Sequence, residues 1–281
     1  MRRERVADDI YVFTSELYAQ VTAGAVITPE GAIVIDTLVF PEESKAILHF
    51  IEQRLNTKVR YIINTHYHAD HTYGTCFFES ATVVSHALCY TLLDSRGRQG
   101  LAEAQQGSRT FQDVTVKLPN LVFEAGELEI RLGDKTLQMW HSPGHSDDSI
   151  AVLVKEDRVL FAADTMMPVP YFVDGKFDDF VESLKKLKNG SFENVVQGHG
   201  EVILRGEIDR KVESDLNYLA QVKHHVQIAL TEPDPQAYLD RIDIEQCGKS
   251  RIPLNGEVQL LHAGNMRALL AQYQAVREAG K

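Results

Sequence analysis

Two stretches with β-strand patterns, each followed by a helical segment, limit what this chain of 281 residues can fold into. The first stretch contains short runs rich in Val and Ile, at residues 10–14, 19–28, 32–39 and 59–64. The second contains runs separated by tight acidic turns, at residues 121–124, 127–132, 136–140, 150–154 and 159–162. Helical patterns begin at Pro41 and at Asp178. This order predicts an α/β (α+β) fold in which two sheets pack face to face with helices on their outer sides.

The last quarter of the chain has a different pattern, because it is helical almost throughout. Breaks fall at residues 232–235, which contain two prolines, and at the loop 248–256, which a glycine opens and another closes. We therefore expect one domain over residues 1–205 and a helical C-terminal extension over residues 206–281 that packs on it.

Charge and cysteine content narrow the class of protein. The chain has 29 Lys and Arg against 40 Asp and Glu, and the formal charge of -11 disfavours nucleic acids and anionic membranes as partners. Its cysteines stand far apart and indicate neither a disulfide framework nor a thiolate metal cluster: Cys76, Cys89 and Cys247. No run approaches the roughly 18 apolar residues of a membrane span. We expect a cytoplasmic protein that acts on a small molecule, and a homodimer remains open.

Histidines gather where a predicted strand ends. The segment T-H-Y-H-A-D-H follows directly after Asn64. In extended backbone His66 and His68 point to the same side, so two imidazoles can bind one ion. Asp70 and His71 fall in the next turn and can serve a neighbouring position, which makes two adjacent metal ions geometrically feasible.

Three further turns place a candidate ligand after a strand. His145 lies in the turn Ser-Pro-Gly-His-Ser, and His199 lies in Gly-His-Gly. Asp164 directly follows an apolar run, where an aspartate can cap a turn or bridge two cations with its two oxygens. Together the four places give seven candidate metal ligands: His66, His68, Asp70, His71, His145, Asp164 and His199.

In this order the motifs H-x-H-x-D-H, G-H-S, A-D-T and G-H-G resemble those of the metallo-β-lactamase superfamily. The resemblance covers roughly residues 7–205 and leaves the helical tail outside. It implies an αββα sandwich with the metal site at one edge of the two sheets. It also implies a role for each ligand: His66, His68 and His145 on the first metal ion, Asp70, His71 and His199 on the second, and Asp164 as the bridge.

A ligand set of imidazoles and carboxylates suits two divalent ions, with Zn²⁺ preferred and Fe or Mn left open. Two cations about 3.5 to 4 Å apart lower the pKa of a shared water and polarise the carbonyl oxygen under attack. The resemblance implies that Asp70 is the catalytic residue that orients this water and accepts its proton. We therefore expect a dinuclear metallo-hydrolase in which a metal-bridging hydroxide is the nucleophile.

The residue at position 164 bears on the substrate. Zinc β-lactamases have a cysteine there and usually a lysine a few residues later, whereas Asp164 is followed by Thr-Met-Met-Pro. In having an aspartate at this position, the chain is similar to glyoxalase II, lactonase-like and phosphodiesterase-type members of the superfamily. We therefore expect an ester, thioester or lactone substrate. Two alternatives remain: a zinc β-lactamase-like amide hydrolase, and an oxidoreductase similar to the mononuclear-iron sulfur dioxygenases.

Two segments are candidates for the pocket wall. The loop 166–172 is rich in Met and aromatic residues, and it either lines a cleft beside the metals or packs in the core. The helical tail packs on the domain, on a partner subunit, or over the site, where it would limit substrate size. Polar residues beside the ligands are candidates to orient them: Asn64, Thr65, Ser142, Ser146, Asp147 and Thr165.

Overall fold

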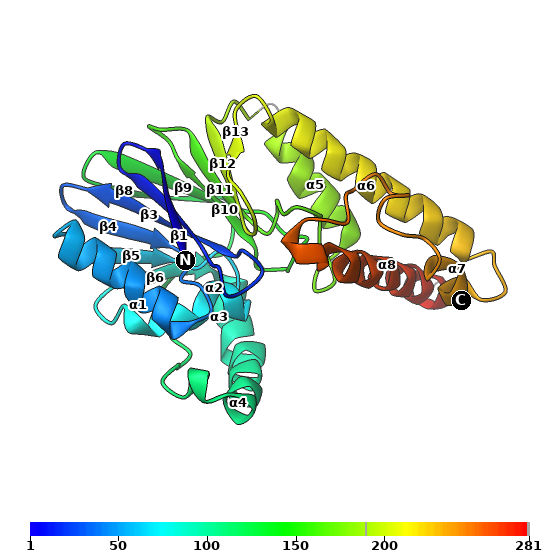
Figure 1. Ribbon diagram of the computed structural model, residues 1–281, viewed down its shortest axis with the longest axis horizontal. Coiled ribbons are helices and arrows are strands. Elements are labelled where there is room, and N and C mark those ends of the chain that lie inside the picture. Colours follow the sequence, from blue (N-terminus) through cyan, green and yellow to red (C-terminus); the bar gives the residue numbers. More distant parts are fainter. Residues whose placement is uncertain (189, 280–281) are drawn as a thin grey trace.

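The computed structural model describes residues 1–188 and 190–279. Two β-sheets form its centre and helices cover their outer faces, so the predicted four-layer αββα sandwich is confirmed (Figure 1). None of the described helices combines the length and apolar character that a membrane crossing needs.

The first sheet has seven strands whose spatial order follows the chain: β1 (Arg2–Ala7), β2 (Ile10–Thr14), β3 (Thr22–Thr28), β4 (Gly31–Ile35), β5 (Val59–Ile63), β6 (Thr82–His86) and β7 (Leu121–Phe123). Strands β1 to β4 pair antiparallel and β4 to β7 pair parallel. In β4, Ile33 and Ile35 face the second sheet, whereas Ala32 and Val34 pack under a helix. This alternation is why β4 can be apolar on both faces.

The second sheet has six strands in the order β13-β12-β11-β10-β9-β8: β8 (Glu127–Leu132), β9 (Lys135–His141), β10 (Ile150–Val154), β11 (Val159–Ala163), β12 (Asn194–Gln197) and β13 (Ile203–Leu204). Only β11 and β12 pair parallel. Val152 and Phe161 pack against the first sheet, and Ala151 and Leu160 pack against helices on the other side.

The longer helices lie on the outer faces of the two sheets. Helix α1 (Pro41–His49), extended by a π-helical turn (Phe50–Arg54), covers the first sheet. Helices α5 (Phe177–Leu187) and α6 (Ile208–Ala229) cover the second sheet, and α8 (Val258–Ala279) packs on α6 within the same hydrophobic cluster. Shorter segments complete the fold: α2 (Ala69–Thr72), a 3₁₀ turn (Tyr73–Phe77), α3 (Ala87–Leu92), a π-helical turn (Leu93–Gly97), α4 (Arg98–Gly107), a 3₁₀ turn (Arg109–Phe111), α7 (Pro235–Leu239) and a 3₁₀ turn (Leu254–Gly256).

Some predicted strand bounds were wrong. No strand was expected at Arg2–Ala7, because its residues are mostly charged; it forms the exposed edge strand β1, where charge protects against pairing with other chains. The run expected from Ala19 forms a strand only from Thr22, because Ala19 and Gln20 have positive φ angles of 42° and 52°. The run expected to reach Val39 ends four residues earlier, since Asp36 has a φ of 56°.

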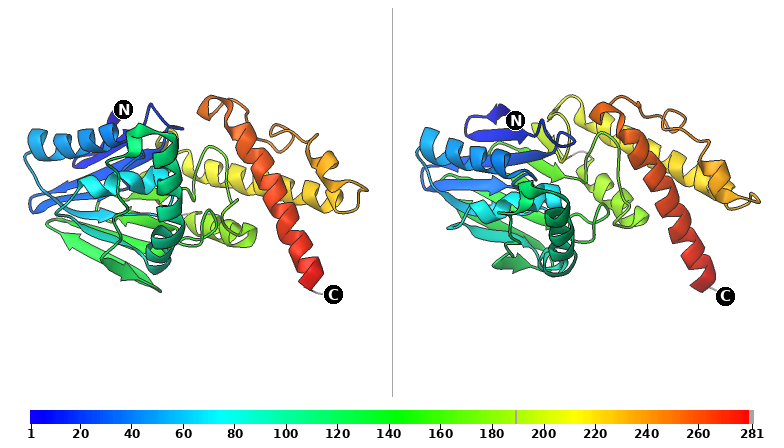
Figure 2. Two further views of the ribbon diagram at one scale, coloured as in Figure 1. Left: turned by 90° about the horizontal axis from the view of Figure 1, so that it is seen from below. Right: turned by 60° about the horizontal axis from the view of Figure 1, so that its bottom comes forward.

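The helical tail packs on the sandwich. Helix α8 crosses α6 at one end of the molecule, and both share one hydrophobic cluster with α5 and the second sheet (Figure 2). The division of the chain at residue 205 stays a prediction.

Candidate metal centre

The seven predicted ligand side chains meet at one edge of the sandwich. The segments that carry them follow β5 (His66 and His68 in the loop, Asp70 and His71 in α2), β9 (His145), β11 (Asp164) and β12 (His199). Backbone hydrogen bonds join the two halves at this edge, among them those from Ile150 N to Thr65 O (2.9 Å) and from Thr22 N to Gly198 O (2.8 Å). The ends of non-adjacent strands are thereby held close enough to form one site.

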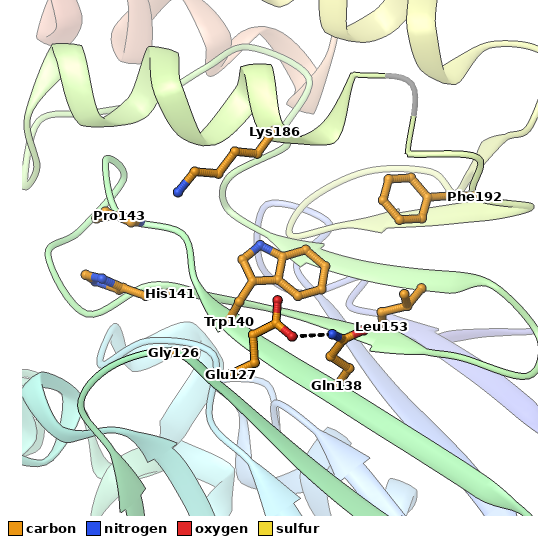
Figure 3. Close-up of a pocket in the computed structure, with 9 residues that line it drawn as sticks. All are labelled: Gly126, Glu127, Gln138, Trp140, His141, Pro143, Leu153, Lys186 and Phe192. Carbon is orange, nitrogen blue, oxygen red and sulfur yellow. Dashed lines mark hydrogen bonds between the residues drawn. The ribbon is translucent and has the colours of Figure 1, made fainter.

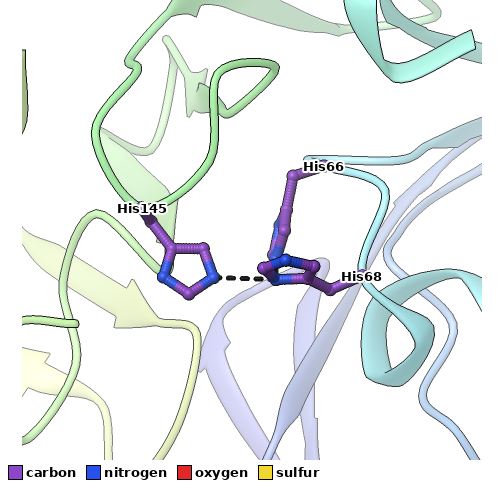
Figure 4. Close-up of side chains that lie close together, drawn as sticks. All are labelled: His66, His68 and His145. Atoms are coloured by element: carbon purple, nitrogen blue, oxygen red, sulfur yellow. Dashed lines mark hydrogen bonds between the residues drawn. The ribbon is translucent and has the colours of Figure 1, made fainter. Parts of the chain in front are cut away.

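Three of these imidazoles face a common point. His68 Nδ1 lies 3.1 Å from His66 Nε2 and 2.9 Å from His145 Nε2 (Figure 4). On the far side of its ring, His68 Nε2 lies 3.2 Å from an Asp174 carboxylate oxygen. A carboxylate can only accept, so His68 Nε2 carries the proton and Nδ1 keeps its lone pair.

The other two imidazoles of this group are fixed in the same way. Thr65 Oγ1 gives its own proton to a carboxylate, so it accepts from His66 Nδ1 at 3.0 Å. His145 Nδ1 donates to the backbone oxygen of Tyr171 at 2.7 Å. In these tautomers, three lone pairs converge, and converging lone pairs repel one another unless a cation lies between them.

A second group lies beside the first. His199 Nε2 is 3.3 Å from Asp70 Oδ2, and His71 Nε2 is 3.8 Å from the same oxygen. Asp164 reaches both groups, because its Oδ2 lies 3.2 Å from His145 Nε2 and 3.5 Å from His199 Nε2. Asp164 is therefore the carboxylate that contacts both groups.

The two histidines of the second group also have anchored Nδ1 atoms. His71 Nδ1 donates to Asp36 Oδ2 at 2.9 Å, and His199 Nδ1 donates to the backbone oxygen of Ala19 at 2.9 Å. All five imidazoles are thus anchored through one ring nitrogen, which leaves the other nitrogen turned toward the centre, where it can bind a metal ion in place of a proton.

Unpaired buried atoms at this centre fit a metal ion. His71 Nε2 and Asp164 Oδ1 lie 3.3 Å apart, are buried, and have no hydrogen-bond partner among the described residues. Gly198 makes room for this carboxylate, because a Cβ at that position would lie 1.7 Å from Asp164 Oδ1. Such orphaned polar atoms are costly in a protein interior unless a further partner satisfies them.

The pKa shifts of the imidazoles also favour a cation at this centre. Burial lowers the pKa of His66 and brings that of His145 to about 4, so both imidazoles stay neutral. Burial opposes protonation of His199 as well, but the carboxylates of Asp164 and Asp70 outweigh it and raise the pKa of this imidazole to about 10. The two carboxylates therefore favour a positive charge beside them, which is a proton on His199 in the metal-free site and which a divalent cation can replace.

A pocket of about 340 Å³ opens onto this centre. Its floor contains residues of both groups, and its walls come from three other segments: Tyr18 and Ala19, Met167 and Tyr171, and Leu254, Glu257 and Leu261. Of the predicted loop 166–172, Met167 and Tyr171 line the pocket while Met166 and Phe172 pack in the core. The helical tail both packs on the domain and forms part of the pocket wall.

A larger hollow of about 670 Å³ lies on the outer face of the second sheet (Figure 3). Trp140, Lys186 and Phe192 are among the residues that line it, whereas none of the seven predicted ligands does so. It is therefore distinct from the pocket at the metal centre.

Two supporting carboxylates were missed in the sequence. Asp36 accepts from Thr65 N (2.8 Å), Thr65 Oγ1 (2.7 Å) and His71 Nδ1, and Asp174 holds His68. Of the six residues expected to orient ligands, Thr65 contacts His66, while Asp147 is exposed. Asp36 ends a buried strand, a signal that could have been used, but nothing near Asp174 in the sequence marks it.

The comparisons with known proteins agree with this geometry. The family model of the metallo-β-lactamase superfamily matches residues 19–228. This chain belongs to that superfamily. The resemblance inferred from the motifs is therefore confirmed. The solved structure of a metallo-β-lactamase from Pontibacter korlensis is similar to this chain, with a TM-score of 0.61. The match covers 75% of this chain and 97% of the Pontibacter chain. At 19% identity this likeness shows the fold alone.

Two curated relatives have hydrolase names. The human acyl-coenzyme A thioesterase MBLAC2 is 26% identical over 155 residues, which make up 49% of this chain and 54% of that protein. Hydroxyacylglutathione hydrolase 1 of Vibrio vulnificus is 27% identical over 161 residues, which make up 56% of this chain and 53% of that protein. This superfamily member therefore spans about half the length of these relatives.

Proposed function

We propose that this chain is a metal-dependent hydrolase that holds two divalent ions and cleaves an ester, thioester or lactone. The observation that carries the proposal is the set of five imidazoles, each anchored through one ring nitrogen with the other facing the same centre at the floor of a pocket. A small-molecule substrate fits this pocket, and cytoplasmic localisation and a homodimer stay predictions.

Each ion would have its own ligand group: His66, His68 and His145 would hold one, Asp70, His71 and His199 the other, and Asp164 could serve both. Nitrogen and oxygen donors without a thiolate suit Zn²⁺, and Fe and Mn remain alternatives. When bound, such ions lower the pKa of a water and polarise the carbonyl under attack.

Asp70 is the carboxylate that can reach a water in the pocket. Its side chain is 17% exposed and lines the pocket, whereas that of Asp164 is 4% exposed and surrounded by imidazoles. The contact with His199 holds Asp70 Oδ2 in place. Asp70 therefore orients the attacking water and accepts its proton, and it can return that proton to the leaving group.

The pocket wall favours an acyl group without charge. No lysine or arginine of the described residues lines it, and Glu257 adds a negative charge. A carboxylate on the substrate, as β-lactams carry, would find no cationic partner in the wall. Met167, Leu254 and Leu261 provide apolar surface for an acyl chain. The names of the two relatives support a thioester.

Removal of the metal should abolish hydrolysis. We expect the purified chain to hold about two metal ions, measured by inductively coupled plasma mass spectrometry, and to cleave a thioester or aryl ester. A chelator should stop turnover and added Zn²⁺ should restore it. The panel also includes an acyl lactone, a β-lactam and a phosphodiester. If all carbonyl substrates stay intact while both ions are bound, the proposal is wrong; bound iron would then favour the oxidoreductase alternative.

Substitution of Asp36 tests whether its hydrogen bond to His71 stabilises the second ligand group. Asp36→Ala removes the acceptor of His71 Nδ1 and leaves the Thr65 donors unpaired. We expect the affinity for Zn²⁺ to fall about 10- to 100-fold, measured by competition with a chromogenic chelator. Asp36→Asn retains one acceptor oxygen and should lose less. Equal affinities for Asp36→Ala and the unaltered chain would show that His71 needs no such support.

A further inference from the structure

The segment between β11 and α5 supports the metal centre from outside. Within it, the backbone oxygen of Tyr171 accepts from His145 Nδ1, and the carboxylate of Asp174 faces His68 Nε2. Tyr67 and Arg96 also donate to Asp174, which fixes this carboxylate in one orientation. The tautomers of His68 and His145 therefore depend on where this segment lies.

Helix α8 holds the backbone of that segment at Asn265. This side chain is fully buried, and its Nδ2 donates to Pro170 O at 2.6 Å while its Oδ1 accepts from Phe172 N at 3.1 Å. The two bonds flank Tyr171 on either side. Tyr218 Oη also accepts from Asn265 Nδ2, at 3.1 Å, so the amide cannot rotate freely.

A second amide of α8 holds the other end of the segment. Gln272 Nε2 donates to Gly175 O at 3.0 Å, and its Oε1 accepts from Phe177 N at 3.2 Å. These bonds flank the residues directly after Asp174. Asn265 and Gln272 are seven positions apart, two turns of helix, so both face the segment.

The packing of α8 leaves little freedom for the segment to move. At Gly264, an added Cβ would lie 3.2 Å from a Val173 methyl and 3.3 Å from the Tyr171 ring. One turn earlier on the same face, Leu261 lines the pocket. The face of α8 that forms the pocket wall is thus the face that holds Tyr171.

We propose that Asn265 and Gln272 are positioning residues of the metal centre, which act through Tyr171 and Asp174 on the orientation of His145 and His68. This inference rests on the proposed function, because it takes these two histidines as ligands. Helix α8 lies beyond residues 19–228, which the family model matches, so this support comes from the part of the chain outside the match. Loss of such outer support typically weakens metal affinity by 10- to 100-fold.

The test compares three substitutions in one helix. Asn265→Ala and Gln272→Ala remove the two amides, and Met266→Ala is the control, because Met266 is 2% exposed in the same helix and packs in the core. Zn²⁺ affinity is measured by chelator competition, Co²⁺ absorption reports ligand geometry, and thermal unfolding reports stability. We expect about 10- to 100-fold weaker Zn²⁺ binding for Asn265→Ala, a smaller loss for Gln272→Ala, and less than about threefold for Met266→Ala whatever its melting temperature.

A second measurement does not depend on bound metal. In metal-free protein, nitrogen-15 NMR of the imidazoles should show His145 protonated at Nδ1, and Asn265→Ala should give a mixture of tautomers. A folded Asn265→Ala chain with unchanged affinity, Co²⁺ spectrum and tautomer would overturn the inference. If that variant does not fold, Gln272→Ala decides by the same three readouts.

The outcomes separate this inference from the proposed function. If the chain binds metal but leaves every carbonyl substrate intact, the proposed hydrolase is wrong. Weaker metal binding by Asn265→Ala would still support the positioning role in that case. If the chain hydrolyses a thioester and Asn265→Ala has the same metal affinity, Co²⁺ spectrum and tautomer as the unaltered chain, only the positioning role is wrong. If the chain binds no metal, the proposed hydrolase is wrong. The tautomer of His145 in the Asn265→Ala chain then tests whether Asn265 orients this imidazole.

Discussion

Asp70→Asn should lower kcat for a thioester or ester by about 10²- to 10⁴-fold, the range expected when a positioned proton acceptor is lost. The amide keeps the shape of the carboxylate and can still face His199, but it cannot take a proton from water. Steady-state kinetics at saturating Zn²⁺, with metal content measured on the same sample, separates lost proton transfer from lost metal.

Asp147→Asn is the matched control for this substitution. Asp147 lies in the loop after β9, close in sequence to His145, but its side chain is exposed. Its kcat should stay within about twofold of the unaltered chain, as for most surface changes. An Asp70→Asn chain that holds two ions and retains full turnover would contradict the role given to Asp70.

Gly198→Ala should remove both metal binding and hydrolysis. The added Cβ would lie 1.7 Å from Asp164 Oδ1 and 2.8 Å from the backbone carbon of Ala163. The backbone cannot move away easily, because Gly198 N donates to Ala163 O at 2.8 Å and Gly198 O accepts from Thr22 N. The carboxylate must therefore leave its place between the two ligand groups. We expect at least about a 100-fold loss of Zn²⁺ affinity, beyond the effect of an outer support alone.

Gly206→Ala controls for the loss of a glycine. No heavy atom lies within 4 Å of a Cβ at Gly206, so metal content and melting temperature should not change. Both chains are compared by mass spectrometry of bound metal and by thermal unfolding. Two ions and normal hydrolysis in Gly198→Ala would mean that Asp164 tolerates displacement, and its assignment as the shared ligand would fail.

The sequence predicted the layers and indicated seven side chains that the fold brings close together, because both depend on local patterns. Each candidate ligand stands where an apolar strand run gives way to a turn, and strand ends in a two-sheet sandwich share an edge. His66 and Asp164 could be placed for this reason without knowledge of the contacts. Their roles as ligands remain predictions that the metal measurements test.

The supporting residues could not be predicted, since their roles come from tertiary contacts. Asp174 meets His68 across 106 positions of sequence, and Asn265 meets Phe172 across 93. Neither lies in a pattern that differs from an ordinary loop aspartate or helical asparagine. The strand β1 was missed for another reason: hydrophobic periodicity is weak in an exposed edge strand.

The hydrogen bonds of Ala19 and Thr22 with the loop at residues 198–199 join segments that are synthesised far apart in time. A chain emerging from the ribosome releases Ala19 long before His199, and the helix that bears Asn265 later still. Nascent chains therefore expose the first histidine motif before Asp174, which fixes the tautomer of His68, has been synthesised. In the proposed hydrolase the complete ligand set therefore forms only after the whole chain has folded, and metal uptake by the full site follows folding.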